Sequence, residues 1–433
     1  MKKFLYFLSF LLFVSLGIFL YWYFQEKGSV PKVLNFPANP FGFFTNNEPP
    51  IIKNGGGGGF NQGTIINGSS TVIIPDKEKL FEKIWSEPVA GYSLIDFTTY
   101  ESTSTEIRGK ITFKEVAVAS STLILFVDRA TGHVYKKTAF VGKGPTQVAN
   151  TTIPGVHDAY FFNGGSEVLL RSLRSGDNAI ISIKAKLPPL SSLVTLPLKG
   201  IQTLPENIIS VAVDSKGEDI SYLIKTNTGS TLYTLSDGVT RKVRDYDLSE
   251  LSLLYKGSTL VVAQKPSAFE KTYLFSSDEK NIYGGRTGQK ILFSQKEDRS
   301  YLSSFWSNIG LTLFTSTLSN TNTHTYTIKT LVDKCVSSKV GNYFFCSVPN
   351  VIPIIPFGLP DDWYKGLLTF NDSLYVVDTV RFGENRLARL EDETGEEFDL
   401  IKPAVSTSDT YLAFSNKKNG SLWLAKLLKL TLR

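Results

Sequence analysis

Residues that bind transition metals are scarce in this sequence. Its 433 residues include two cysteines, Cys335 and Cys346, and three histidines, His133, His157 and His324. A structural zinc site needs four such ligands at characteristic spacings, and none of the histidines lies at ligand spacing from a cysteine. We therefore expect neither a metal nor another cofactor.

Several catalytic and binding motifs are also missing. There is no Gly-x-Ser-x-Gly nucleophile elbow, which excludes a serine peptidase that uses this motif. The segment "SNKKNGSLW" (415–423) resembles a sialidase Asp-box but has Lys417 where the aspartate belongs. The net charge of +6 comes from scattered basic residues, whereas a nucleic-acid-binding protein concentrates them in a stripe. We expect no catalytic residue and no nucleic-acid partner.

The N-terminus lacks charge over a long stretch. No charged residue occurs from Phe4 to Phe24, and as a helix this run would rise about 31 Å, close to the thickness of a bilayer core. Lys2 and Lys3 predict a cytoplasmic N-terminus. The run exceeds the core of a cleaved signal peptide, which is the alternative. We predict an uncleaved signal anchor within residues 1–27 that places the rest of the chain outside the cytoplasmic membrane.

Residues 28–79 have the composition of a linker. Prolines punctuate the segment, and Gly55 to Gly59 form a run of five glycines. The run lacks the Gly-Lys-Ser/Thr ending of a phosphate-binding loop. Such a segment cannot bury enough apolar surface to order itself. We predict a disordered linker that holds an extracytoplasmic domain, residues 80–433, above the membrane.

The remaining chain repeats one hairpin pattern. "YLAFSNKKNGSLWLAKL" (411–427), "SYLIKTNTGSTLYTL" (221–235) and "LILFVDRATGHVYKKT" (123–138) each have a strand, a polar turn and a second strand. One position of the second strand recurs about every 48 residues, at Tyr135, Ile181, Tyr233, Tyr273, Tyr326, Tyr375 and Trp423. This spacing predicts an all-β propeller of seven blades with four strands each. Six or eight blades, or a pair of irregular β-sandwiches, are the alternatives.

The two ends of this domain carry their own predictions. Residues 76–87 form the only short helix candidate. The hairpin 411–427 reads as the middle of the last blade, so its missing strand must come from elsewhere. We predict that residues 88–97 supply this strand and close the ring.

The repeat resembles a known class. "ISVAVDSKGEDISYLIKTNTGSTLYTL" (209–235) resembles the TolB-type and WD-like propeller repeat, with residues 214–217 at its turn but without the usual proline. "KCVSSKVGNYFFCSVP" (334–349) and "LPDDWYKGLLTFNDSLYVVDT" (359–379) resemble uncharacterised membrane-anchored propellers of bacterial candidate phyla. The resemblance implies a fold and says little about chemistry.

Cys335 and Cys346 flank a turn near Val340 and Gly341. A chain reversal there would place the two cysteines opposite each other on paired strands, at a separation that a disulfide can bridge. In an oxidising compartment we predict a disulfide. Two buried free thiols or half of a metal site are the alternatives.

The most suggestive polar stretch is Asp361, Asp362, Trp363 and Tyr364. The carboxylates could act as an acid and a base or hold a cation, and the rings could stack on a sugar. Neighbouring residues of a strand face opposite sides, however, and Pro-Asp-Asp is a good turn opener. A structural turn with a packed tryptophan is the alternative.

These observations predict a membrane-tethered binding or scaffold module that acts without catalysis. Its partner in the cell envelope would be a protein or a glycan bound at one rim of the propeller. One alternative is an extracytoplasmic carbohydrate-active enzyme with a site at the mouth of the channel. Another is a subunit of an envelope assembly.

Overall fold

The computed structural model describes most of the chain after the predicted linker. The described residues are 79–427 without 108–109, 215, 237, 279–281, 297–299, 308–309, 319–321 and 354–357. The predicted signal anchor and almost all of the predicted linker lie outside them. Within the described ranges, none of the helices is long and apolar enough to cross a bilayer.

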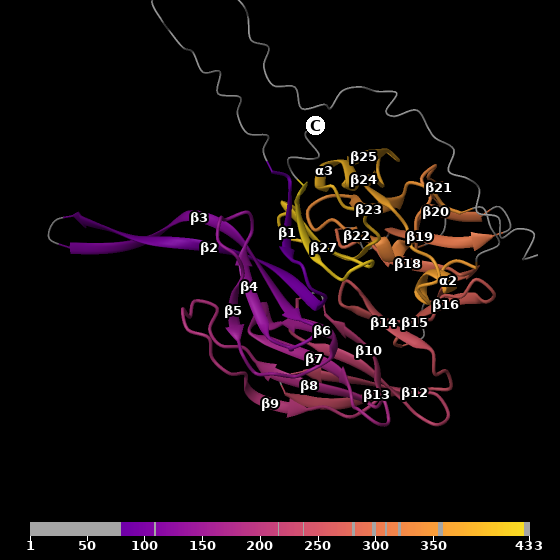
Figure 1. Ribbon diagram of the computed structural model, residues 1–433, viewed down its shortest axis with the longest axis horizontal. Helices are drawn as coiled ribbons and strands as arrows, with labels where there is room; N and C mark the ends of the chain where they lie inside the picture. The colour runs from indigo at the N-terminus through magenta and orange to yellow at the C-terminus, as the bar shows by residue number, and fades with distance from the viewer. Residues whose placement is uncertain are drawn as a thin grey trace, which may run out of the picture. The chain divides into compact units, whose positions relative to one another are not determined.

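Seven antiparallel sheets of four strands each form a β-propeller (Figure 1). The first three in chain order consist of β2 (Val89–Ile107), β3 (Lys110–Asp128), β4 (Val134–Thr138) and β5 (Thr146–Ala149); β6 (Val156–Phe162), β7 (Glu167–Leu173), β8 (Ile180–Lys186) and β9 (Lys199–Thr203); and β10 (Ile208–Val213), β11 (Ile220–Lys225), β12 (Ser230–Ser236) and β13 (Val239–Tyr246). The predicted fold class and blade number are confirmed, and the β-sandwich alternative is excluded.

The remaining sheets follow the same order. They consist of β14 (Leu251–Lys256), β15 (Thr259–Gln264), β16 (Lys271–Ser276) and β17 (Ile282–Thr287); β18 (Lys290–Phe293), β19 (Ser300–Ser307), β20 (Gly310–Thr317) and β21 (Thr323–Thr325); β22 (Cys335–Ser337), β23 (Tyr343–Pro349), β24 (Asp372–Asp378) and β25 (Glu384–Arg389); and β26 (Leu400–Val405), β27 (Tyr411–Asn416), β28 (Leu422–Lys426) and β1 (Phe81–Trp85). Short helices connect some strands: η1 (Asn163–Gly165), η2 (Val332–Lys334), α2 (Asp361–Tyr364) and α3 (Leu390–Thr394).

The core lies between neighbouring sheets. Between the closing sheet and the sheet β2–β5, for example, Ile84 and Leu424 pack with Ile124 and Phe126, and all four are buried. The middle strands are therefore apolar on both faces, as in the run Leu422–Ala425, because each sheet is covered on both sides by its neighbours.

The ring is closed by β1, not by residues 88–97. Phe81 pairs with Ala425, and Glu82 with Leu424, so β1 adds the outer strand to the hairpin 411–427. Residues 88–97 instead fall in β2, which pairs with β3, and that predicted closure is wrong. The helix predicted for 76–87 is also wrong, since 81–85 form a strand. A register shift between Lys83 and Trp85 lets Phe81 and Ile84 both be buried, which mimics helical spacing.

One repeat position was misplaced. Seven residues were predicted to occupy equivalent positions of the repeat. Six of them lie on the third strand of their blade, but Tyr326 directly follows the fourth strand, β21. In addition, an insertion of 22 residues, 350–371, separates β23 from β24 in the sheet β22–β25. The predicted number of blades is nevertheless correct, because each of the seven residues belongs to a different blade.

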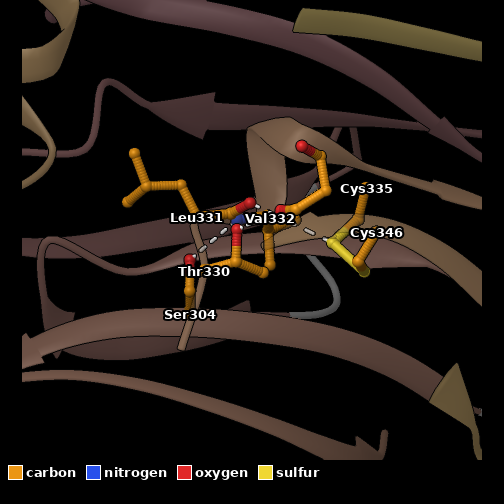
Figure 2. Close-up of a disulfide and its surroundings, with 7 residues drawn as sticks. Ser304, Thr330, Leu331, Val332, Cys335 and Cys346 are labelled. Carbon is orange, nitrogen blue, oxygen red and sulfur yellow. Dashed lines mark hydrogen bonds between the residues drawn. A yellow bond between two sulfur atoms is a disulfide. The ribbon is translucent and has the colours of Figure 1, made fainter. Parts of the chain in front are cut away.

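The two cysteines form the predicted disulfide. Cys335 on β22 and Cys346 on β23 lie opposite each other in register and are bonded through their sulfurs (Figure 2). Both residues are buried. The bond joins the first two strands of one blade, and within the described residues there is no free cysteine.

The hairpin of β2 and β3 is far longer than any other. Its strands have 19 residues each, and their pairing runs from Val89 opposite Asp128 to Ile107 opposite Lys110. β4 pairs with β3 only over Leu123–Val127. The end of the hairpin therefore projects from its sheet as a two-stranded ribbon, residues 98–119 (Figure 1). We call this ribbon the arm.

Candidate functional site

A cluster of charged groups lies near the centre of the ring. Asp158 on β6 accepts bonds from Lys402 Nζ and Arg171 NH1, both at 2.9 Å, and from the Tyr160 hydroxyl at 2.6 Å. β6 and β26 are the first strands of sheets that the sheet β2–β5 separates. An ion pair that spans an intervening blade requires a position near the propeller axis.

Close packing of the inner strands makes this contact possible. A Cβ at Gly91 of β2 would lie 2.1 Å from the carbonyl oxygen of Ala159 on β6, so only glycine fits there. Lys402 has a φ of +51°, which places it in the left-handed region beside a register shift of β26. Its Nζ passes 3.4 Å from the carbonyl oxygen of Ala90.

The cluster keeps Asp158 ionised. Burial opposes ionisation, but the charges of Lys402 and Arg171 and the Tyr160 hydroxyl outweigh it, so the pKa of Asp158 is below 3.8. Burial, with the carboxylate next to it, raises the pKa of Tyr160. Burial and then the charge of Arg171 lower the pKa of His157. A carboxylate held in this way is a poor general acid.

The hydrogen-bond partners of Asp158 are two cations and a hydroxyl. The cluster ties β6, β7 and β26 together, and its polar groups point at one another.

The stretch Asp361–Tyr364 forms the one-turn helix α2. Asp361 accepts a hydrogen bond from the backbone of Ala268, and Asp362 accepts one from Gly358 N at 2.9 Å. Trp363 is 4% exposed and donates from Nε1 to Asp399, while Tyr364 donates to Asp333 at 3.0 Å. The four polar groups thus have partners within the protein, and their role as ligands stays a prediction.

Trp363 belongs to a buried charged cluster. Lys334, Asp372 and Asp399 have side chains that are 0% exposed. Lys334 Nζ bonds Asp372 Oδ2 at 2.7 Å and also Asp399, and it lies 5.2 Å from the centre of the Trp363 ring. Trp363 Nε1 and the backbone N–H of Phe370 donate to Asp399 at 2.9 and 3.2 Å. We call Lys334, Asp372 and Asp399 the buried triad.

Low dielectric surroundings perturb the titration of this cluster. Burial raises the pKa of Asp372, although Lys334 and the N–H of Leu400 act in the opposite direction. Burial also lowers the pKa of Lys417, whose Nζ lies 4.3 Å from the centre of the Trp363 ring. The carboxyl of Asp372 therefore gains a proton more readily than an exposed aspartate does.

Sequence reasoning did not identify the buried triad, although a signal was present. Lys334 directly precedes β22, Asp372 begins β24, and Asp399 directly precedes β26. In a blade the starts of the first and third strands lie at the same rim. Three charged residues at the starts of such strands are therefore candidates for one cluster, provided that the strand order is known.

The segment 350–371 serves as an internal brace. Its residue Asp361 contacts Ala268 of the sheet β14–β17. Leu359 and Trp363 pack with Leu311 and Leu331, around the sheet β18–β21. Lys417 of the closing sheet donates to the carbonyl of Trp363. The insertion thereby contacts three blades besides its own.

No three His, Cys, Asp or Glu side chains in the described part of the chain are grouped so that they could hold a metal ion.

The comparisons with known proteins found similar folds only. No family model and no curated protein matches the sequence. The periplasmic gluconolactonase PpgL of Pseudomonas aeruginosa is 12% identical with a TM-score of 0.44, over 70% of this chain and 90% of its own. TolB from Acinetobacter baumannii is 8% identical with a TM-score of 0.37, over 77% and 79%.

The β-propeller domain of the Trilobed protease from Pyrococcus furiosus is 11% identical with a TM-score of 0.38, over 58% of this chain and 74% of its own. TolB and other β-propeller proteins are thus among the similar structures. Identities this low say nothing about the chemistry of this chain.

Proposed function

We propose that the chain is a membrane-tethered binding or scaffold module without catalytic activity, which engages a protein partner in the cell envelope. The tether in this proposal is the uncharged run from Phe4 to Phe24, and the propeller lies outside the cytoplasmic membrane. The observation that supports a protein partner over a glycan is the arm, residues 98–119.

The arm has little stability of its own, and a bound partner would stabilise it. A two-stranded ribbon is marginally stable by itself in water. Along residues 98–119 the two strands pair with each other, and β4 pairs with β3 only from Leu123 onward. Among the strands that the structure describes, none pairs with the outer backbone edges of the ribbon, and open edges are templates for an added strand.

Strand addition fits these edges better than sugar binding. A protein segment that pairs with an open edge gains affinity from main-chain hydrogen bonds and specificity from alternate side chains. A glycan has no regular ladder of N–H and C=O groups to match the edge. The proposed partner is accordingly a protein that contributes an extended segment to the arm.

The test is cross-linking of the full chain in its native envelope, followed by mass spectrometry. Lys110 and Lys114 supply primary amines on the arm, and we expect partner cross-links to map to them. A shortened variant would join Phe97 to Ser121, which are paired, through an Asn-Gly turn. It should lose these partners and keep the melting temperature of the propeller.

The matched control is Lys199→Gln, on the exposed strand β9. This variant should retain all cross-links to the arm. If the shortened variant captures the same proteins as the unaltered chain, the arm is not the binding element and the proposal is wrong.

The alternative function is a carbohydrate-active enzyme with a site at the channel mouth. The observation in its favour is the charged cluster around Asp158. Turnover of envelope glycans by the purified chain that disappears in Asp158→Asn would establish it. The saturation of Asp158 by Lys402 and Arg171 makes the binding role the better supported of the two.

A further inference from the structure

A basic pocket lies at the seam where the ring closes. Its volume is about 450 Å³, and it is bounded by β1, the end of β28 and the loop from Ala139 to Pro145 between β4 and β5. Five lysines and one glutamate contribute to its lining: Lys79, Lys83, Lys137, Lys143, Lys426 and Glu82.

Two of these charged residues shape the loop. The Lys137 side chain is 5% exposed, and its Nζ donates to the carbonyl oxygens of Val141 and Lys143, both at 2.8 Å. It also pairs with Glu82 at 3.1 Å. Glu82 in turn accepts a bond from Phe140 N at 3.0 Å, and Phe140 has a φ of +53°. The loop is therefore wrapped around a buried, mutually neutralised ion pair.

The other lysines leave an excess of positive charge. Lys83 bonds Glu396, which is not part of the lining. Within the described residues, neither Lys79 nor Lys143 has a carboxylate partner. Lys426 Nζ lies 4.4 Å from the centre of the Phe140 ring. Because Lys137 pairs with Glu82 and Lys83 pairs with Glu396, Lys79 and Lys143 set the sign of the potential in the pocket.

The loop also offers backbone donors. Among the residues that the structure describes, the N–H groups of Gly142, Lys143 and Gly144 have no hydrogen-bond acceptor. A Cβ at either glycine would meet no atom within 4 Å, so the loop is open on this side. Successive free N–H groups in a turn commonly form an anion-binding concavity.

We propose that this pocket binds the phosphate group of a phosphate ester. Lysine ammonium groups act as point charges toward phosphate, and a phosphate can accept hydrogen bonds from several directions at once. A carboxylate accepts in one plane and carries a single charge, so it would use fewer of these donors. The volume leaves room for an organic group in addition to the phosphate.

The position of the pocket allows two sources of this chemistry. Lys79 is the first described residue before β1, and Lys426 ends β28, so the pocket lies where the chain enters and leaves the propeller. A soluble phosphate ester or a phospholipid headgroup carries the same group. This assignment requires neither the arm nor a protein partner, but its lipid source rests on the membrane tether of the proposed function.

The experiment is equilibrium dialysis of the full chain in nanodiscs against labelled inorganic phosphate. In phosphatidylcholine nanodiscs we expect saturable binding with a dissociation constant of about 1 mM. Lys79→Gln and Lys143→Gln should each weaken binding about five- to tenfold. Lys199→Gln, on an exposed strand away from the pocket, should change it less than twofold. Lys143→Arg preserves the charge and should retain binding.

Nanodiscs that contain phosphatidylglycerol distinguish the sources. If phosphate binds more weakly in them than in phosphatidylcholine nanodiscs, and Lys143→Gln reduces this difference between the two nanodiscs, a lipid headgroup is the competitor. Equal binding in both nanodiscs would identify a soluble phosphate ester. The proposal is overturned if phosphate does not bind saturably, or if both glutamine variants bind it as the unaltered chain does while melting at the same temperature.

Discussion

Replacing Lys334 by methionine should be among the most destabilising single changes in the propeller. Methionine retains much of the length and volume of the side chain but removes the charge. The substitution would leave Asp372 and Asp399, both fully buried, without the cation that bonds them. Removal of one partner from a buried ion pair costs about 3–5 kcal/mol, because the remaining charge is left uncompensated.

The members of the buried triad should not be equivalent. Burial raises the pKa of Asp372, so Asp372→Asn removes a carboxyl whose ionised form burial disfavours and leaves one cation with one carboxylate. This change should cost about 1 kcal/mol. Asp399 accepts bonds from Lys334, Trp363 and Phe370, so Asp399→Asn should cost more than Asp372→Asn.

The assay is calorimetric melting of the full chain at pH 7. For a unit of this size, 1 kcal/mol corresponds to a shift of about 1–2 °C, so Lys334→Met should melt roughly 5 °C lower than the unaltered chain. The variant with Lys334→Met, Asp372→Asn and Asp399→Asn together should recover part of this loss. The reasoning fails if Lys334→Met costs less than Asp372→Asn.

Three further outcomes follow from the structure. Because the pKa of Asp158 is lowered, its stabilising contribution is present above pH 3.8 and is lost as the pH falls through the folded value, so the melting difference between the unaltered chain and Asp158→Asn should shrink in acid. Loss of the disulfide in Cys335→Ser with Cys346→Ser should destabilise the chain by about 2–3 kcal/mol in urea unfolding, and non-reduced mass spectrometry should show the bond in exported protein. Phe81→Ala removes a ring that is 4% exposed from the closing strand and should cost about 3–5 kcal/mol by the same unfolding assay, whereas an unchanged midpoint would mean that β1 does not hold the ring shut.

The repeat was readable from the sequence because it is a local pattern. A strand, a polar turn and a second strand lie within about 17 residues, and pairing within such a hairpin needs no knowledge of distant segments. The same holds for Cys335 and Cys346, which flank a single turn. These predictions were correct for that reason.

Closure of the ring depended on long-range pairing, and there the prediction failed. Residues 81–85 and 88–97 are both apolar enough to form a strand, and they are separated by a few residues. The choice between them is made by packing: Phe81 fits beside Trp423 and Leu412, whereas Val89 and Gly91 are needed in β2. The order of apolar and polar residues along the sequence does not show which of the two segments packs better against the last blade.

The same difference between local and long-range contacts explains which candidate sites were predicted. Asp361 and Asp362 were predicted as ligand candidates because they are adjacent, yet each accepts a hydrogen bond from a backbone N–H. Lys334 and Asp399, which are 65 residues apart, were not predicted as a site, because charged residues at strand ends usually face solvent. Their contact arises from the arrangement of two blades.

Departures from the repeat are candidates for the binding sites that we propose. All seven sheets share the strand pattern that stability requires, so an extension found in one blade alone is the place to look for function. The insertion 350–371 is such a departure, but its residues Leu359, Asp361 and Trp363 contact neighbouring blades. In the described part of the chain, the arm pairs only within itself, and the loop from Ala139 to Pro145 has backbone N–H groups without acceptors. Both belong to the sheet β2–β5, next to the closing strand β1, so the two sites that we propose, one for a protein strand and one for a phosphate, lie on the blade beside the seam.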